Sequence, residues 1–309
     1  MEKTLLKQLY NIHAYSGNLE KISDFILDKL EDLDVFVEID KVGNIYATKG
    51  ISETYPCLAC HIDQIQKTRS KDFVCIESKN IIFGYSPSKN QQEGLGADDK
   101  NGIFICLEML KEMDVLKCVF FVDEEIGCVG SSNCDMNFFN DCRFIIQPDR
   151  RGSKDLITEM FCGDVCSEDF ITALCAENFG YTKASGTITD VGNLVESNVG
   201  ISCLNLSCGF YHEHTDKEFT NIKDLENCIN FIRWILMNVT DTYPFMSSYS
   251  HYTNYHDNYD DYDIMDIIYS WNQYSTFEEL YEENKECFTS SKTQLRKMYE
   301  RISLYNSII

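Results

Sequence analysis

The hydrophobic positions along the chain follow two spacings, one typical of helices and one typical of strands. Residues 2–13 and 18–32 have apolar side chains at helical intervals, which predicts two amphipathic helices. Residues 35–48 alternate apolar and polar positions around a Gly–Asn turn, which predicts a β-hairpin. Further elements follow the same patterns: buried strands at 56–62, 116–125, 142–150 and 200–209, and helices at 101–113, 167–179 and 221–239.

Strands that alternate with helices predict an α/β fold. We expect a three-layer architecture, in which a mixed and mostly parallel sheet has helices on both faces. Two short strands, 71–78 and 80–86, and a polar loop at 89–94 interrupt the alternation.

The composition changes after residue 240. Residues 247–263 are rich in Tyr, Asp and Asn and have no clear periodicity, which is typical of an exposed connection. Two short helices are expected between residues 275 and 305. The sequence therefore predicts a main domain over residues 1–240 and a C-terminal extension over residues 241–309.

The amino-acid composition limits which kinds of partner the chain is expected to bind. The chain has 309 residues, and its 27 basic and 50 acidic residues give a formal charge of −23. This balance argues against nucleic acid, because phosphate binding depends on Lys and Arg. Its fifteen cysteines, an odd number, lie partly in apolar runs, which favours reduced thiols and a cytoplasmic location. No apolar run approaches the ~20 residues of a membrane span, so no membrane partner is expected.

The polar residues suited to chemistry gather where the predicted strands end. Five short segments contain them: 59–65 (ACHIDQI), 94–102 (GLGADDKNG), 120–127 (FFVDEEIG), 144–152 (FIIQPDRRG) and 211–219 (YHEHTDKEF). Each segment alone is uninformative, because HxD is common and paired acids usually mark solvated loops. In α/β sheets, however, ligands bind outside the carboxyl ends of the strands. We therefore expect these segments to form one site.

The side chains of these segments suit divalent metal ions. His61 and His214 offer nitrogen ligands. The carboxylates of Asp98, Glu125 and Asp149 offer oxygen ligands. This mixture is typical of zinc, cobalt or manganese, because calcium prefers oxygen alone. Such a set can hold two ions about 3.5–4 Å apart around a shared water. We expect two divalent metal ions, with zinc as the first candidate.

Two further carboxylates fit supporting roles. Neighbouring side chains at a strand end point in different directions. One member of the Glu124–Glu125 pair can therefore bind metal while the other accepts a proton. Asp63 follows His61 by two residues and can accept a hydrogen bond from its second ring nitrogen.

The neighbouring histidine and arginines have simpler explanations. His212, like His214, could be a surface residue. Arg150 and Arg151 follow Asp149 and could bind a substrate carboxylate, but a surface pair is the more common arrangement.

Together the five segments resemble the co-catalytic zinc exopeptidases. This family includes peptidase T, the aminoacylase and glutamate carboxypeptidase relatives, and the single-domain zinc aminopeptidases. The resemblance runs from about residue 4 to residue 240, and peptidase T is nearest in the GADDK and DEEIG segments. The matching segments are YSGNLEKISDFILDKL, DKVGNIYA, HxD, GADDKNG, DEEIG, the late Asp and HTDKEF.

The resemblance implies a role for each candidate: a bridging ligand (Asp98), ligands of one ion (His61 and Asp149), ligands of the other ion (Glu125 and His214), a general base (Glu124) and a residue that orients His61 (Asp63). It favours His214 over His212 because an acid, Glu218, follows four residues later. It also implies a cis peptide bond between Asp98 and Asp99.

One feature departs from the peptidase T pattern. Peptidase T and its near relatives insert a lid and dimerisation domain of roughly a hundred residues before the last histidine. Here His214 follows Asp149 by 65 residues. Strand and helix patterns and a turn at 185–193 already occupy this segment, as in the lidless aminopeptidases. We therefore expect no lid domain, no lid-mediated dimer and no inherited tripeptide preference.

The sequence thus predicts metal-dependent hydrolysis of a terminal peptide bond, in the first place by an aminopeptidase that acts on short peptides. A deacylase of N-acyl amino acids is an alternative with the same metals. Two further alternatives are a non-catalytic relative that uses the fold for binding and a cyclase of the same architecture. The binding relative is disfavoured, because the ligands, the base and Asp63 are all present.

Overall fold

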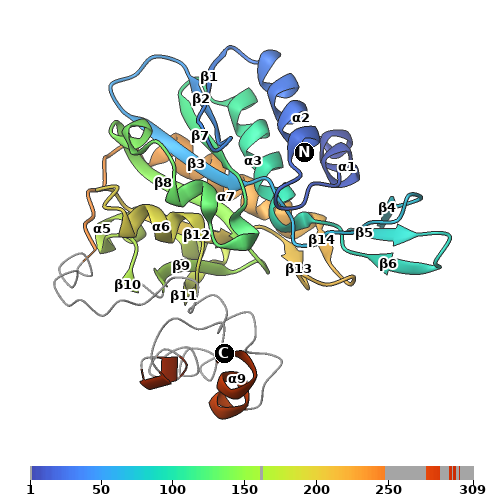
Figure 1. Ribbon diagram of the computed structural model, residues 1–309. Helices are drawn as coiled ribbons and strands as arrows, with labels where there is room; N and C mark the ends of the chain where they lie inside the picture. The colour runs from blue at the N-terminus through green and yellow to red at the C-terminus, as the bar shows by residue number, and fades with distance from the viewer. Residues whose placement is uncertain are drawn as a thin grey trace. The chain divides into compact units, whose positions relative to one another are not determined.

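The computed structural model describes residues 2–160, 163–247 and 276–285, together with residues 292, 293, 295, 296 and 299. Its central sheet has nine strands in the order β1-β2-β7-β3-β8-β12-β9-β10, with β11 paired to β9 (Figure 1). The strands are β1 (Val35–Ile39), β2 (Ile45–Lys49), β3 (Tyr55–His61), β7 (Leu116–Phe121), β8 (Cys142–Arg150), β9 (Asp155–Met160), β10 (Gly163–Asp164), β11 (Thr182–Ser185) and β12 (Cys203–Ser207).

Four parallel strands form the middle of this sheet. β7, β3, β8 and β12 are parallel neighbours, whereas β1, β2 and β10 add antiparallel pairs at the edges. Every residue of β3 and β7 is buried, as expected for parallel strands that are covered on both faces. The carboxyl ends of the parallel strands meet at one edge of the sheet, where β3 and β8 deliver the first candidate ligands.

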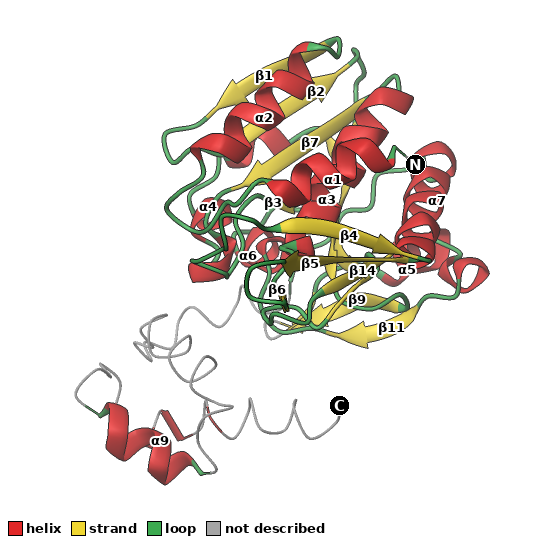
Figure 2. Cartoon of the chain, turned by 90° about the vertical axis from the view of Figure 1, so that its right-hand side faces the viewer, coloured by secondary structure: helices red, strands yellow, loops and turns green. Residues whose placement is uncertain are grey.

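Helices cover both faces of the central sheet (Figure 2). They are α1 (Lys3–Asn11), α2 (Glu20–Glu31), α3 (Ala97–Glu112), α4 (Val129–Ser132), α5 (Glu168–Ala173), α6 (Asp190–Glu196) and α7 (Ile222–Asn238), with single 3₁₀ turns η1 (Glu124–Ile126), η2 (Met136–Phe139) and η3 (Ala176–Phe179). Two hydrophobic clusters result. Leu58 and Cys60 join the cluster with α1, α2, α3 and α7, while Cys57 and Ala59 join the one with α6. This alternation along β3 confirms a three-layer fold.

A smaller antiparallel sheet lies beside the central one (Figure 1). Its order is β13-β14-β5-β4, with β6 on β5. The strands are β4 (Val74–Ser78), β5 (Ile81–Ser86), β6 (Gln91–Glu93), β13 (Phe210–Tyr211) and β14 (Phe219–Asn221). The two predicted strands at 71–78 and 80–86 are therefore confirmed. The predicted polar loop at 89–94 is wrong in part, because its backbone pairs with β5 while Gln91 and Gln92 stay exposed.

The segment between the fourth and fifth motifs builds the central sheet rather than a separate domain. Residues 150–213 contribute β9, β10, β11 and β12 and the helices α5 and α6. The absence of a lid is thus confirmed for the described part of this segment. The predicted turn at 185–193 is wrong in its second half, where α6 begins at Asp190.

The chain divides into two compact units, Met1–Ser250 and His251–Ile309. Tyr243 and Phe245 hydrogen-bond to the backbone of the main unit at residues 143 and 200–202. In the second unit α9 (Phe277–Asn284) matches one of the two short helices expected there. The Tyr/Asp/Asn-rich segment after Ser247 lies outside the described residues, and the division at residue 240 stays a prediction. Among the helices that the structure describes, none has the length and apolar character of a membrane span.

Candidate metal centre

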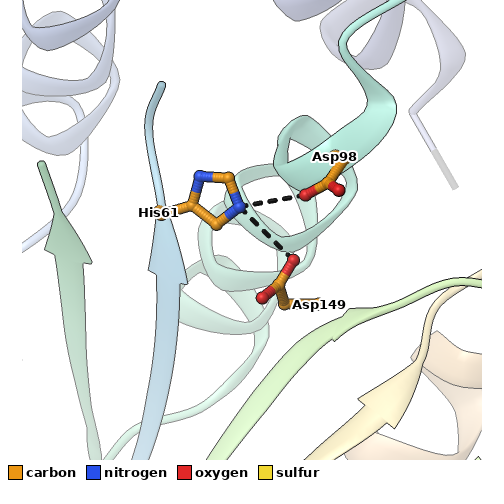
Figure 3. A group of neighbouring side chains, drawn as sticks. All are labelled: His61, Asp98 and Asp149. Atoms are coloured by element: carbon orange, nitrogen blue, oxygen red, sulfur yellow. Dashed lines mark hydrogen bonds and ion pairs between the residues drawn. The ribbon is translucent and has the colours of Figure 1, made fainter. Parts of the chain in front are cut away.

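His61 is the last residue of β3 and its ring faces two carboxylates. Its Nε2 atom lies 3.0 Å from Asp98 Oδ1 and 3.4 Å from Asp149 Oδ1 (Figure 3). The side chain is 1% exposed. Since β3 is buried along its whole length, the strand holds the ring at a fixed place at the sheet edge.

Asp63 links His61 to the paired glutamates. Its Oδ1 atom lies 3.3 Å from His61 Nδ1, so that Nδ1–H can donate to it. The same carboxylate accepts the backbone N–H groups of Glu124 (2.9 Å) and Glu125 (3.2 Å). It also accepts the Ser16 hydroxyl at 2.7 Å. Asp63 therefore orients the ring and anchors the turn that carries both glutamates.

Asp98 lies between the two candidate histidines. While its Oδ1 faces His61, its Oδ2 lies 3.4 Å from His214 Nε2. Asp98 belongs to both groups of potential ligands, namely His61 with Asp98 and Asp149, and Asp98 with Glu125 and His214. In each group the ligand atoms lie within 4.8 Å of one another. The peptide bond between Asp98 and Asp99 is cis, as predicted.

Two buried carboxylates hold the backbone around Asp98. Glu218 accepts the N–H groups of Gly96 (2.5 Å) and Asp98 (3.1 Å). Asp99 accepts the N–H groups of Gly102 (2.9 Å) and His61 (3.3 Å). Gly96 has φ +67°, and a Cβ there would lie 2.7 Å from Lys100 Nζ. A side chain at this position would thus collide with the buried lysine.

Glu124 and Glu125 lie on the 3₁₀ turn η1 rather than on the strand, because β7 ends at Phe121. The turn directs the Glu125 side chain toward His214 and the Glu124 side chain toward His61. Glu125 is 3% exposed and its Oε2 lies 3.0 Å from His214 Nε2. Glu124 Oε2 lies 4.0 Å from His61 Nε2, and the thiol of Cys128 donates to Glu124 Oε1 at 3.5 Å.

Asp149 is held by a buried network that sequence reasoning missed. Gln147 Nε2 donates to Asp149 Oδ2 (3.2 Å) and to Asp190 Oδ2 (3.0 Å). Gln147 Oε1 accepts the Thr189 hydroxyl at 2.8 Å, and Ser131 donates to Asp190 at 2.6 Å. The available signal was a polar residue inside the apolar run FIIQPD, since a buried glutamine must find partners.

His214 comes from a loop rather than from a sheet or helix. Its side chain is 45% exposed, and its φ of +61° is uncommon for a residue other than glycine. Side-chain contacts stabilise the loop. Thr215 donates to the carbonyl of His212 at 2.7 Å, and Arg151 Nη1 lies 2.7 Å from Glu213 Oε1. That ion pair joins the His214 loop to the residues that follow Asp149.

The other sequence candidates do not join the ligand groups. The His212 ring packs 5.7 Å from the ring of Phe219. Arg150 pairs with Asp155, at 3.2 Å between Nε and Oδ2. The surface-pair interpretation of Arg150 and Arg151 therefore fits their contacts better than substrate binding does.

Burial dominates the electrostatics of the acids. It raises the pKa of Glu124 and Glu125, and it raises the pKa of Asp149 to about 8. Asp98 behaves differently: burial acts to raise its pKa, but hydrogen bonds from His214 and His61 hold it well below the usual range.

For the two histidines, burial acts to lower the pKa and the nearby carboxylates act to raise it. Burial lowers the pKa of His61, but Asp149, Asp63 and Asp98 outweigh burial and raise it. The same competition, with hydrogen bonds to Asp98 and Glu125, raises the pKa of His214 to about 12.

These residues fit two divalent cations. Buried carboxylates are costly unless positive charge compensates them. Two imidazoles and three carboxylates in two groups that share Asp98 offer the mixed nitrogen and oxygen ligands of zinc-type ions.

Comparison with known proteins gives a structural likeness without a sequence match. A scan against protein-family models finds no match, and a search of the curated proteins finds none. Among solved structures, the aminopeptidase PepT from Bacillus cereus is similar with a TM-score of 0.65 and 14% identity, over 77% of this chain and 97% of that chain. A tripeptidase from Staphylococcus aureus has a TM-score of 0.62 and 15% identity, over 76% of this chain and 96% of that one.

A third neighbour is the TET1 peptidase of Pyrococcus horikoshii, which can assemble into a tetrahedron or a large octahedral shell. Its TM-score is 0.54 and its identity 16%, over 76% of this chain and 98% of that chain. The chain thus shares the fold of these peptidases, in agreement with the fold that the motif resemblance implies. A shared fold does not by itself assign a reaction, so the function must be argued from the site.

Proposed function

We propose that this protein is a two-metal hydrolase that removes the amino-terminal residue from short peptides. The observation that carries the proposal is the pair of ligand groups joined by Asp98, with the carboxylate of Glu124 beside them. The peptidases that share the fold support the substrate class. The reaction belongs to the main domain, residues 1–240.

In this proposal five side chains hold the ions: His61, Asp98 and Asp149 for one, and Asp98, Glu125 and His214 for the other. When bound, two divalent ions lower the pKa of a water molecule and polarise the peptide carbonyl. Asp63 fixes the tautomer of His61, because accepting Nδ1–H leaves the Nε2 lone pair facing the centre.

Glu124 is the proposed general base. Its carboxylate lies beside the ligands without belonging to either group, and burial raises its pKa. A carboxylate with a raised pKa can accept a proton from the attacking water and then release it to the leaving amine. Cys128, which donates to Glu124 Oε1, limits the directions in which this carboxylate can point.

The decisive experiment combines metal analysis with a substrate panel. We expect the purified full chain to bind two zinc ions per chain and to release free amino acids from aminoacyl amides and short peptides. Glu124→Gln should lower kcat by about 10²–10⁴ and leave the metal content unchanged. The exposed Glu53→Gln variant is the matched control.

Two results would count against the proposal. Unchanged turnover in Glu124→Gln rejects this residue as the base. Turnover of N-acyl amino acids alone, with peptides untouched, replaces the aminopeptidase by a deacylase with the same metal ligands.

A further inference from the structure

A hollow of about 720 Å³ opens on the small antiparallel sheet. Three apolar side chains on neighbouring strands, Ile81, Phe83 and Phe219, form part of its floor. Phe219 of β14 is paired with Phe83 of β5, and Ile81 of β5 is paired with Asn221. Because residues two apart on a strand share a face, Ile81 and Phe83 face the same side. Ile81 is 38% exposed, so part of this floor is open to solvent.

The charge of the hollow contrasts with that of the chain. The described residues that line it include Lys79 and Lys217 but no Asp or Glu, although acidic residues outnumber basic ones by 50 to 27. Both lysines are exposed, and neither forms an ion pair with a described residue within 4.0 Å. The hollow thus offers two ammonium groups above an apolar floor, which suits a ligand with a carboxylate and a hydrophobic body.

The hollow adjoins the candidate metal centre through one loop. His212 lines the hollow, whereas His214, two residues later, contacts Asp98 and Glu125. Lys217 lies on the same loop, and Phe219, two residues later, begins β14. An extended peptide advances roughly 3.3 Å per residue. His212 and His214 are two residues apart, so their Cα atoms lie within about 7 Å of each other, and a peptide of a few residues bound at the centre can extend to the edge of the hollow.

We propose that the hollow binds the part of a peptide substrate that follows the cleaved bond, with Lys79 and Lys217 attracting its carboxylate. The carboxylate is that of the peptide's own C-terminus. This inference rests on the proposed function and makes it more specific: the preferred substrates are short peptides with a free C-terminal carboxylate. Both ammonium groups are exposed, so dissolved ions screen their attraction for the carboxylate. The preference for the carboxylate should therefore weaken as salt is added.

Binding is measured first, so that the hollow is tested separately from catalysis. Calorimetry uses the zinc-loaded Glu124→Gln chain, in which turnover is slow, and compares two peptides of identical sequence, alanyl-glycyl-leucine as the free acid and as the C-terminal amide. We expect the free acid to bind roughly tenfold more tightly, as for two exposed charge contacts of ordinary strength. Lys79→Glu combined with Lys217→Glu should remove this difference.

Kinetics then separate positioning from chemistry. In the Lys79→Glu variant the KM for the free acid should rise severalfold, while kcat and the KM for the amide stay within about twofold. Lys41→Glu is the matched control, because Lys41 is also an exposed lysine in a hairpin turn but lies outside the hollow. Lys79 makes no contact with the metal ligands among the described residues, so its substitution leaves the centre intact.

The outcomes distinguish the two proposals. Equal binding of acid and amide by the Glu124→Gln chain overturns the hollow as a carboxylate site, even if the wild-type chain hydrolyses both peptides. Preferential binding of the acid without hydrolysis rejects the peptidase proposal and keeps the hollow. If Lys79→Glu instead changes the sedimentation coefficient and leaves peptide binding unaltered, the face contacts a second copy of the chain, and the peptide assignment is wrong.

Discussion

The two halves of the candidate metal centre are built in different ways. His61 ends β3, and Asp149 lies one residue before the end of the neighbouring strand β8. Figure 3 shows the two side chains facing each other with Asp98 beside them. Glu125 and His214 come instead from a 3₁₀ turn and from an exposed loop. We call these the strand half and the loop half. The strand half is formed by the sheet itself, whereas the loop half depends on side-chain contacts.

One site can thus combine a rigid part, the strand half, with an adjustable part, the loop half. Backbone pairing fixes the strand ends, because β3 is paired with β8 at residues 55–58 and with β7 at residues 57–61. A loop residue such as His214 has no ladder partner. Its position depends on Thr215, on Glu213 with Arg151, and on Glu218 beneath Asp98. We therefore expect the strand half to bind its ion more tightly than the loop half.

The largest effect should follow from removing the residue that both halves share. Asp98→Ala removes an oxygen ligand from each group, so both ions should bind much more weakly and turnover should fall to background. Metal analysis after dialysis measures this, with the exposed Asp32→Ala variant as control. Retention of both ions in Asp98→Ala would contradict the bridging role.

A second change acts on the strand half alone. Gln147→Leu removes the donor to Asp149 and leaves Asp190 with one fewer buried hydrogen bond. We expect the free energy of unfolding to drop by about 1–3 kcal/mol and the affinity for the strand-half ion to drop by roughly 10–100-fold. Chemical denaturation and zinc titration measure the two effects. The exposed Gln91→Leu variant should show neither effect. If Gln147→Leu weakens the binding of the loop-half ion alone, this prediction is wrong.

A third change loosens the loop half. Arg151→Ala breaks the ion pair with Glu213, which should weaken the loop-half ion by about tenfold. The free energy of unfolding should change by at most about 1 kcal/mol, because the pair is partly exposed. Arg233→Ala, which breaks a comparable pair with Glu112, is the control.

A charge exchange tests whether the pair itself matters. The double variant Arg151→Glu with Glu213→Arg should recover much of the lost affinity, since opposite charges still face each other. If it binds zinc no better than Arg151→Ala, the loop is held by its other contacts, such as that of Thr215.

The smallest expected effect is a difference in how readily the two ions leave the unmodified protein. During titration with a chelator, the loop-half ion should leave first, because His214 is 45% exposed and His61 is 1% exposed. Substituting cobalt makes the two steps visible by absorption spectroscopy. A single step, or loss of the strand-half signal first, would remove the distinction between the halves.

Much of the strand half was predictable from the sequence. The runs that became β3 and β8 are mostly apolar, and such runs predict strands covered on both faces. Parallel strands end together, so His61 and Asp149 had to meet at one edge. The loop half was predictable only through the motif resemblance, because nothing local to the segment 211–219 specifies a loop that approaches Glu125.

Other features could not be predicted from local patterns. β6 has a polar sequence and exists because it pairs with β5, and β14 pairs with β5 across more than a hundred residues of chain. The start of α6 at Asp190 follows from partners that lie far away in the sequence. Gln147 accepts the N–H of Val191 at 3.1 Å, and Ser131 donates to Asp190.

The alternation of strands and helices and the identity of the candidate ligands followed from the sequence, because periodicity and ligand chemistry are local properties. The residues that support Asp149, and the hollow that Lys79 and Lys217 line beside the His214 loop, were visible in the folded chain alone. These are contacts between segments distant in the chain. Their geometry is set by sheet pairing and by the burial of polar groups that must find partners.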